Sequence, residues 1–282
     1  KKFNFQYVAC QNCETSYVNP RPTPEIIKWY YTNSENYKFW NKYTFPLSEK
    51  SRIKSIIKPR INRILEICEK ENVKKDLFVE VGPGFGTFGQ ELIKTNYFSK
   101  FLAIEPMPDL AETCRKKGLD VIEENIEDIK LNSVKATVIG SFEVIEHLFS
   151  PLEFLKGINK QLKKDGLIFI TCPNINGFEV KTLGKISDTY DIEHLNYFSI
   201  ESLSSLIEKS GFKVIQTMTP GLLDADIVRK KINLGQKKIS NKNFLHSILI
   251  KEWDQLGNSF QKFLSENKLS THMWIVAKKT QI

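Results

Sequence analysis

The segment that most constrains the fold of this chain is a short apolar run followed by glycines. Residues 77–81 are apolar except for Glu80, and an apolar run of this length is typical of a buried parallel strand. Glycine lets the backbone turn sharply and approach a ligand closely, and residues 87–94 are then expected to form a helix whose amino terminus points at that ligand. The glycines stand at alternate positions: Gly82, Gly84 and Gly86.

Two cofactor classes fit this segment. Residues 84–89 match the G-x-G-x-x-G dinucleotide pattern, which leaves an NAD-dependent oxidoreductase as an alternative. Glu80 separates the two, because its carboxylate would repel a pyrophosphate and attract a ligand with an amino group and a sulfonium. The segment resembles motif I of the class I S-adenosylmethionine (SAM) dependent methyltransferases. The resemblance implies SAM as cofactor and S-adenosylhomocysteine (SAH) as product.

Strand-like and helix-like segments alternate from residue 77 onward, which predicts an α/β fold with a doubly wound, mostly parallel, Rossmann-like sheet. The resemblance implies seven strands, the last antiparallel beside the fifth. The expected strands are 77–81, 101–105, 120–122, 136–140, 167–172, 212–218 and 273–277. The expected helices are 87–94, 109–117, 152–162 and 200–209.

Three regions follow from this pattern. Residues 1–22 are a partial zinc-ribbon-like segment, 23–76 a helical and aromatic lid segment, and 77–282 the methyltransferase domain. That domain carries an insertion at 220–270, in which apolar residues recur at helical spacing over 244–264. We expect a long helix there, packed on the core, contributing to a substrate lid, or forming a dimer face.

A set of residues at the strand ends is expected to hold the cofactor. Glu105 ends the second strand, where a carboxylate can accept both ribose hydroxyls; capping of the next helix is the alternative role. The resemblance places Asn125 and Ile126 at the adenine, and Tyr30 or Tyr37 at the methionine carboxylate. The complete predicted set is Glu80, Gly82, Gly84, Gly86, Glu105, Pro106, Asn125, Ile126, Ser141, Phe142 and Tyr37.

Acidic residues and histidines follow the fourth strand, where a methyl acceptor should lie. Glu143, Glu146 and His147 resemble the E-x-x-E-H motif of ubiquinone-pathway O-methyltransferases and small-RNA 2′-O-methyltransferases, in which these side chains hold a divalent ion. His194 matches a later histidine ligand of the RNA enzymes. Three interpretations stay open: all four residues bind Mg²⁺ or a similar ion, His147 acts as a metal-free general base assisted by Glu146 and His194, or the motif merely starts a helix.

The amino-terminal segment contains two cysteines at zinc-knuckle spacing, Cys10 and Cys13. Two thiolates supply half of a tetrahedral Zn²⁺ site. The stretch resembles the start of a group of bacterial methyltransferases in which one C-x₂-C pair precedes another in a small zinc ribbon. We therefore expect Zn²⁺ only where a longer chain supplies the second pair. Otherwise the two cysteines are bystanders in a reduced loop.

Aromatic residues are dense between 29 and 45, where they could stack on nucleic acid bases or fold over the cofactor as a lid. The formal net charge of +8 comes from lysines spread along the whole chain, so charge alone does not indicate a nucleic-acid partner. Five scattered cysteines argue against a disulfide framework. No run approaches the about 20 apolar residues that cross a bilayer, and the start shows no secretory signal. We expect a cytoplasmic protein without a membrane partner.

These observations predict a SAM-dependent methyltransferase that acts on a small-molecule acceptor. The expected acceptor is a hydroxyl of a sugar or a related metabolite, by analogy with the zinc-ribbon relatives. The alternative is a metal-dependent RNA 2′-O-methyltransferase. A SAM-binding domain without activity is a further, non-enzymatic hypothesis, which the intact motif argues against.

Overall fold

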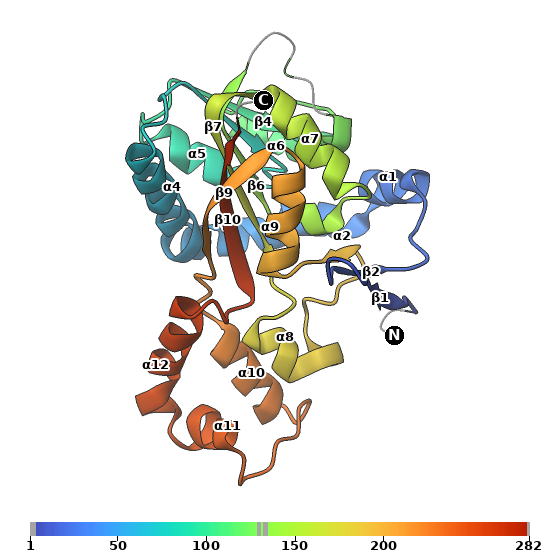
Figure 1. The fold of residues 1–282 in the computed structure, drawn as a ribbon, viewed down its shortest axis with the longest axis vertical. Coiled ribbons are helices and arrows are strands. Elements are labelled where there is room, and N and C mark those ends of the chain that lie inside the picture. The colour runs from blue at the N-terminus through green and yellow to red at the C-terminus, as the bar shows by residue number, and fades with distance from the viewer. Residues whose placement is uncertain (1–3, 129–130, 132–134, 281–282) are drawn as a thin grey trace.

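Seven strands form one sheet at the centre of the molecule (Figure 1). The computed structural model describes residues 4–128, 131 and 135–280. The sheet order is β5-β4-β3-β6-β7-β10-β9; the first five strands are parallel, and β10 is antiparallel to both of its neighbours. The strands are β3 (Leu77–Val81), β4 (Lys100–Ile104), β5 (Val121–Ile122), β6 (Ala136–Phe142), β7 (Leu162–Pro173), β9 (Phe212–Met218) and β10 (His272–Lys279). The predicted Rossmann-like sheet with an antiparallel last strand is confirmed.

Helices cover both faces of this sheet, because each strand buries apolar side chains on both sides. Phe78 of β3 packs with α4 (Lys58–Lys70) and α5 (Thr87–Ile93) on one face. Val79 and Val81 pack with α7 (Pro151–Gln161) and α9 (Ile200–Lys209) on the other. A further helix, α6 (Pro108–Lys116), follows β4. Predicted and observed ends agree within a few residues, except that β7 begins earlier than expected.

The amino-terminal segment joins the carboxyl edge of the sheet. Its first part is a hairpin of β1 (Tyr7–Ala9) and β2 (Ser16–Val18), which pairs with β8 (Asn196–Tyr197) in a small second sheet that the sequence did not predict. Arg21 fixes this arrangement by donating to the carbonyl of Phe149 at 2.5 Å and to Oδ1 of Asn196 at 2.6 Å. The helices α1 (Pro24–Asn33), α2 (Glu35–Phe39) and α3 (Phe45–Arg52) follow.

A helical lobe lies below the sheet in the view of Figure 1. It has its own apolar cluster, which includes Leu183, Val228, Leu249 and Leu264. The expected long helix at 244–264 is broken, because Glu252 leaves the helical conformation at φ −112° and ψ 27°. None of the helices in the described ranges has the length and apolar character needed to cross a membrane. The lobe consists of α8 (Phe178–Leu183), α10 (Asp224–Asn233), α11 (Phe244–His246) and α12 (Trp253–Glu266).

Candidate active site

The glycine loop after β3 turns with left-handed backbone conformations at Gly82, Gly84 and Gly86. At Gly82 a Cβ atom would lie 2.6 Å from Val144, so a side chain is excluded by packing as well as by a φ of +71°. At Gly84 the φ is +53°, and nothing lies within 4 Å of the Cβ position. The loop therefore combines a closely packed first glycine with open space at the second, the arrangement that a ligand approaching the backbone needs.

Glu105 lies directly after β4, beside this loop, as predicted. Its side chain is only 3% exposed, and its Oε1 accepts the backbone N–H of Met107 at 3.0 Å. Burial raises the pKa of Glu105 to about 7, although the backbone N–H groups of Met107 and Gly84 act in the opposite direction. A buried carboxylate with remaining acceptor capacity is suited to a pair of ligand hydroxyls.

Glu80 points to the face of the sheet that α4 covers, next to Arg60. Its Oε2 accepts no hydrogen bond from any described residue. Burial raises the pKa of Glu80 to about 8, with Arg60 lowering it and Glu105 raising it further. The Arg60 guanidinium lies 4.5 Å from the ring centroid of Phe142, and its Nε also has no partner among the described residues. Glu80 and Arg60 thus both have unused hydrogen-bonding atoms on this face of the sheet.

The remaining predicted cofactor residues lie around the same edge. Ser141 is paired in register with Val81, and its buried hydroxyl has no partner in the described part of the chain. Ile126 reaches to 3.7 Å from the Cβ position of Gly82. Asn125 is exposed, and Pro106 is half-buried beside Glu105. The side chain of Tyr37, on α2, lies outside the described part of the structure.

Three of the four predicted metal or catalytic side chains come together after β6. The ligating atoms of Glu146, His147 and His194 all lie within 4.8 Å of one another. The rings of His147 and His194 are edge to face, with 4.7 Å between centroids. His194 is held by its Nδ1 against the carbonyl of Thr189 at 2.8 Å, which leaves Nε2 for another partner. Neither carboxylate oxygen of Glu146 nor Nδ1 of His147 has a hydrogen-bond partner in the described ranges.

The electrostatics of this cluster follow from burial. Burial and the nearby Glu143 carboxylate raise the pKa of Glu146 well above its usual range. Burial and the His194 imidazole lower the pKa of His147 to about 3. The cluster therefore favours a neutral imidazole on His147 at physiological pH. Burial of the Glu146 carboxylate without a partner is unfavourable, and coordination to a cation between Glu146 and the two histidines would offset that cost.

Glu143 does not point into this group of three. The sequence suggested that Glu143 and His147 share one helical turn, but only Ile145–His147 form a short 3₁₀ turn, and Glu143 precedes it with a φ of +57°. Oε1 of Glu143 accepts the Thr171 hydroxyl at 2.7 Å and lies 3.2 Å from Nδ1 of His272. Although partial burial acts in the opposite direction, His272, Arg60 and the Thr171 hydroxyl lower the pKa of Glu143 to about 2.

Sequence reasoning missed His272. Because β10 is antiparallel to β7, its first residue lies opposite Pro173 at the carboxyl edge of the parallel strands. The signal was available in principle: in a sheet whose last strand is reversed, the start of that strand reaches the ligand edge.

The donor set defines which metal ions could be held here. One carboxylate and two imidazoles, Glu146, His147 and His194, suit Mn²⁺, Fe²⁺ or Zn²⁺ better than Mg²⁺, which prefers oxygen ligands and near-ideal octahedral geometry. The unpartnered atoms of Glu146 and His147 fit such an ion.

Cys10 and Cys13 lie at the tip of the β1–β2 hairpin, and hydrogen bonds from the backbone of Asn12 and Cys13 lower the pKa of the Cys10 thiol.

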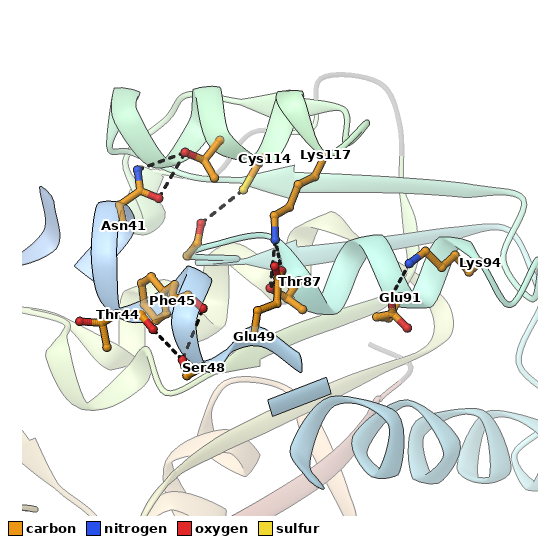
Figure 2. A network of polar contacts seen from close by, with 12 residues as sticks. Asn41, Thr44, Phe45, Ser48, Glu49, Thr87, Glu91, Lys94, Cys114 and Lys117 are labelled. Atoms are coloured by element: carbon orange, nitrogen blue, oxygen red, sulfur yellow. Dashed lines mark hydrogen bonds and ion pairs between the residues drawn. The ribbon is translucent and has the colours of Figure 1, made fainter. Parts of the chain in front are cut away.

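Helix α3 lies against the start of α5 and against Lys117, as Figure 2 shows through Glu49. A π-helical segment, Trp40–Thr44, precedes α3. Oε1 of Glu49 accepts the hydroxyl of Thr87, the first residue of α5, at 2.7 Å and pairs with the ammonium of Lys117. The ring of Phe45 stacks on Phe85 of the loop with 5.4 Å between centroids. The amino-terminal segment is thus fastened to the glycine loop, to the start of α5 and to Lys117 directly after α6.

Comparison with known proteins identifies the family. A family model described as a methyltransferase domain matches residues 50–217, more than half of the chain. The chain belongs to the class I SAM-dependent methyltransferases. The match includes the glycine loop and the Glu143–His147 segment, so the resemblance found in the sequence is confirmed at the level of the family.

Individual relatives of this methyltransferase are more distant. It is 26% identical over 234 residues to the C-methyltransferase NovU of Streptomyces niveus, covering 80% of this chain and 50% of NovU. It therefore spans about half the length of that relative. It is 24% identical over 213 residues to a tRNA U34 carboxymethyltransferase of Campylobacter jejuni, covering 68% of each chain. A SAM-dependent methyltransferase structure from Clostridium acetobutylicum shares the fold at 12% identity, with a TM-score of 0.56 over 86% of this chain and 99% of that one.

Proposed function

We propose that this methyltransferase transfers the methyl group of SAM to a hydroxyl of a small-molecule acceptor held beside His147. The observation that carries the proposal is the cluster of Glu146, His147 and His194 at the carboxyl edge of the sheet. Ligands of open α/β sheets bind at this edge. A buried group of unpartnered polar atoms beside a predicted cofactor loop is a candidate for chemistry on an acceptor.

The cofactor would lie across the glycine loop. In this proposal Gly84 gives it close access to the backbone, Glu105 accepts its ribose hydroxyls, and Asn125 and Ile126 hold the adenine. Support comes from the open space at Gly84 and from the buried Glu105 carboxylate. SAM supplies an electrophilic methyl group on a sulfonium. Its positive charge would lower the pKa of Glu80, and the resulting carboxylate would favour SAM over a pyrophosphate.

The chain's own contribution to the reaction would be positioning and proton removal. An attacking hydroxyl must lie about 3 Å from the methyl carbon, in line with the leaving sulfur, which the pocket walls would enforce. The hydroxyl must also lose its proton, and the neutral imidazole of His147, which lines a cavity, can accept a hydrogen bond from it. Glu146, His147 and His194 would hold a divalent ion if one is used, and such an ion lowers the pKa of an acceptor hydroxyl.

Two observations favour alternative acceptors. NovU is by name a C-methyltransferase, which favours a carbon acceptor that loses a proton in the same way. The tRNA U34 carboxymethyltransferase, by name an enzyme that acts on tRNA, favours an RNA acceptor. An RNA acceptor would give binding that weakens steeply with salt, because phosphate contacts release counterions, whereas a small uncharged acceptor would not.

Transfer of labelled methyl groups from SAM tests the proposal. Candidate hydroxyl acceptors, including sugars and phenols, are compared with tRNA and with carbonyl compounds that offer an acidic carbon. We expect His147→Ala to lower the turnover of the preferred small acceptor at least tenfold and to leave SAH affinity unchanged. His246→Ala, in the helical lobe, is the matched control. Transfer to RNA only, or loss of SAH binding in His147→Ala, would contradict the proposal.

A further inference from the structure

A cavity of about 180 Å³ lies between the amino-terminal segment and the chain around residues 192–195. Helix α1 lines it with Ile27, Tyr30 and Tyr31, so the cavity exists only because the amino-terminal segment is packed against the sheet edge. His147 is part of its wall. The cavity therefore reaches the cluster of Glu146, His147 and His194 from a side away from the proposed cofactor position at the glycine loop.

The volume of the cavity limits the size of a ligand that can bind in it. An apolar protein cavity of roughly 150 Å³ holds a benzene molecule, so about 180 Å³ accommodates one six-membered ring with a substituent. A nucleotide or a disaccharide would extend beyond this volume into solvent.

Three polar side chains of the cavity wall, Tyr30, Glu193 and His147, lie next to one another. The Tyr30 hydroxyl donates to Oε1 of Glu193 at 2.7 Å, and Oε2 of Glu193 lies 4.0 Å from Nδ1 of His147. Tyr31 also lines the cavity, with its ring edge to face with that of His147 at 6.4 Å between centroids. The remaining lining residues are apolar: Phe5, Pro22, Ile26, Ile27, Ile192 and Leu195.

Because polar and apolar walls are separate, the number of hydroxyl groups on a ring decides how well it fits the cavity. A ring hydroxyl buried against the apolar walls would lose its hydrogen bonds to water without replacement, at a cost of about 1–3 kcal/mol for each group. A ring with several hydroxyls therefore fits poorly. A ring with an apolar body and one hydroxyl at the His147 end meets both kinds of wall.

We propose that this cavity is the acceptor subsite, and that it takes a single ring with an apolar body whose one hydroxyl faces His147, as in a phenol. The assignment rests on the proposed function of the same site and narrows its acceptor class. Ile27 and Ile192 shape the apolar walls and are specificity-determining residues.

Binding of 4-fluorophenol to the full chain with saturating SAH, followed by fluorine NMR, tests the subsite without measuring activity. Ile27→Phe reduces the cavity and should weaken binding at least tenfold, with SAH affinity unchanged. Ile93→Phe, at an exposed position on α5, is the matched control and should bind like the wild type. Ile192 is 49% exposed, so Ile192→Phe narrows the same cavity at a position that tolerates a larger side chain.

The outcomes separate the two proposals. Displacement of 4-fluorophenol by equal concentrations of methyl glucoside, or equal binding to wild type and both cavity variants, would overturn the subsite. Competition by phenols but not by methyl glucoside, lost in the cavity variants, would support it. If the fluorophenol binds as expected and no small acceptor receives a labelled methyl group, the subsite stands and the proposed function is wrong.

Discussion

Nδ1 of His272 lies 3.2 Å from Oε1 of Glu143, where the first residue of β10 meets the end of β6. The Trp274 indole N–H donates to Nε2 of His272 at 2.9 Å, so the proton of a neutral imidazole is on Nδ1 and is donated to Glu143. Thr171 donates to the same carboxylate oxygen. The left-handed backbone of Glu143 and the two donors to its carboxylate fix the direction of this side chain at the carboxyl edge of the sheet.

The first prediction concerns this contact. His272→Ala should lower kcat by about tenfold, equivalent to about 1.4 kcal/mol, because Glu143, whose charge raises the pKa of Glu146, loses one of the two donors that orient it. SAH affinity should stay unchanged. His272→Asn can still donate an N–H and should recover part of the loss. Equal effects of both variants on protein stability and on kcat would mean that His272 is only structural.

The second prediction concerns the cofactor. Glu105→Ala should raise the Kd for SAH at least tenfold, because the ribose hydroxyls lose a buried acceptor. Glu123→Ala, which removes an exposed carboxylate nearby on the chain, is the control. Isothermal titration calorimetry measures both, and an unchanged Kd for Glu105→Ala would exclude the ribose role.

The third prediction concerns pH. The pKa of Glu80 is about 8 in the fold against an ordinary value of 4.5, so between these values the folded protein holds a proton that the unfolded chain has released. The free energy of unfolding without cofactor should therefore fall as the pH rises through this window, by at most about 1.4 kcal/mol per pH unit. Glu80→Gln should remove this part of the slope in denaturant titrations from pH 5 to 8. A parallel slope in the variant would reject the assignment.

The fourth prediction concerns the lid. Glu49→Ala removes the partner of Thr87 and Lys117, which are part of the attachment of α3 to the glycine loop (Figure 2). The Kd for SAH should rise about three- to tenfold, and proteolysis of residues 40–57 without ligand should be faster. Glu35→Ala, which breaks an exposed pair with Lys38, should change neither. Equal rates of proteolysis in the two variants would exclude the attachment.

The glycine loop and Glu105 could be predicted from the sequence, because local sequence patterns determine them. The strand, the glycines and Glu105 follow one another within about 30 residues, and turn chemistry and apolar runs fix their places. The direction of Glu143 could not be read, because it depends on a left-handed backbone residue and on His272, which the reversed last strand brings in. The pairing of β2 with β8 and the contact of Tyr30 with Glu193 likewise join segments that are distant in the sequence.

The most direct test of the account is calorimetry of the full chain with SAH and, separately, with NAD⁺. We predict micromolar binding of SAH and no measurable heat with NAD⁺, because Glu80 can ionise beside the cationic amino group of SAH but offers no positive charge to a pyrophosphate. Tight binding of NAD⁺ with no binding of SAH would contradict it.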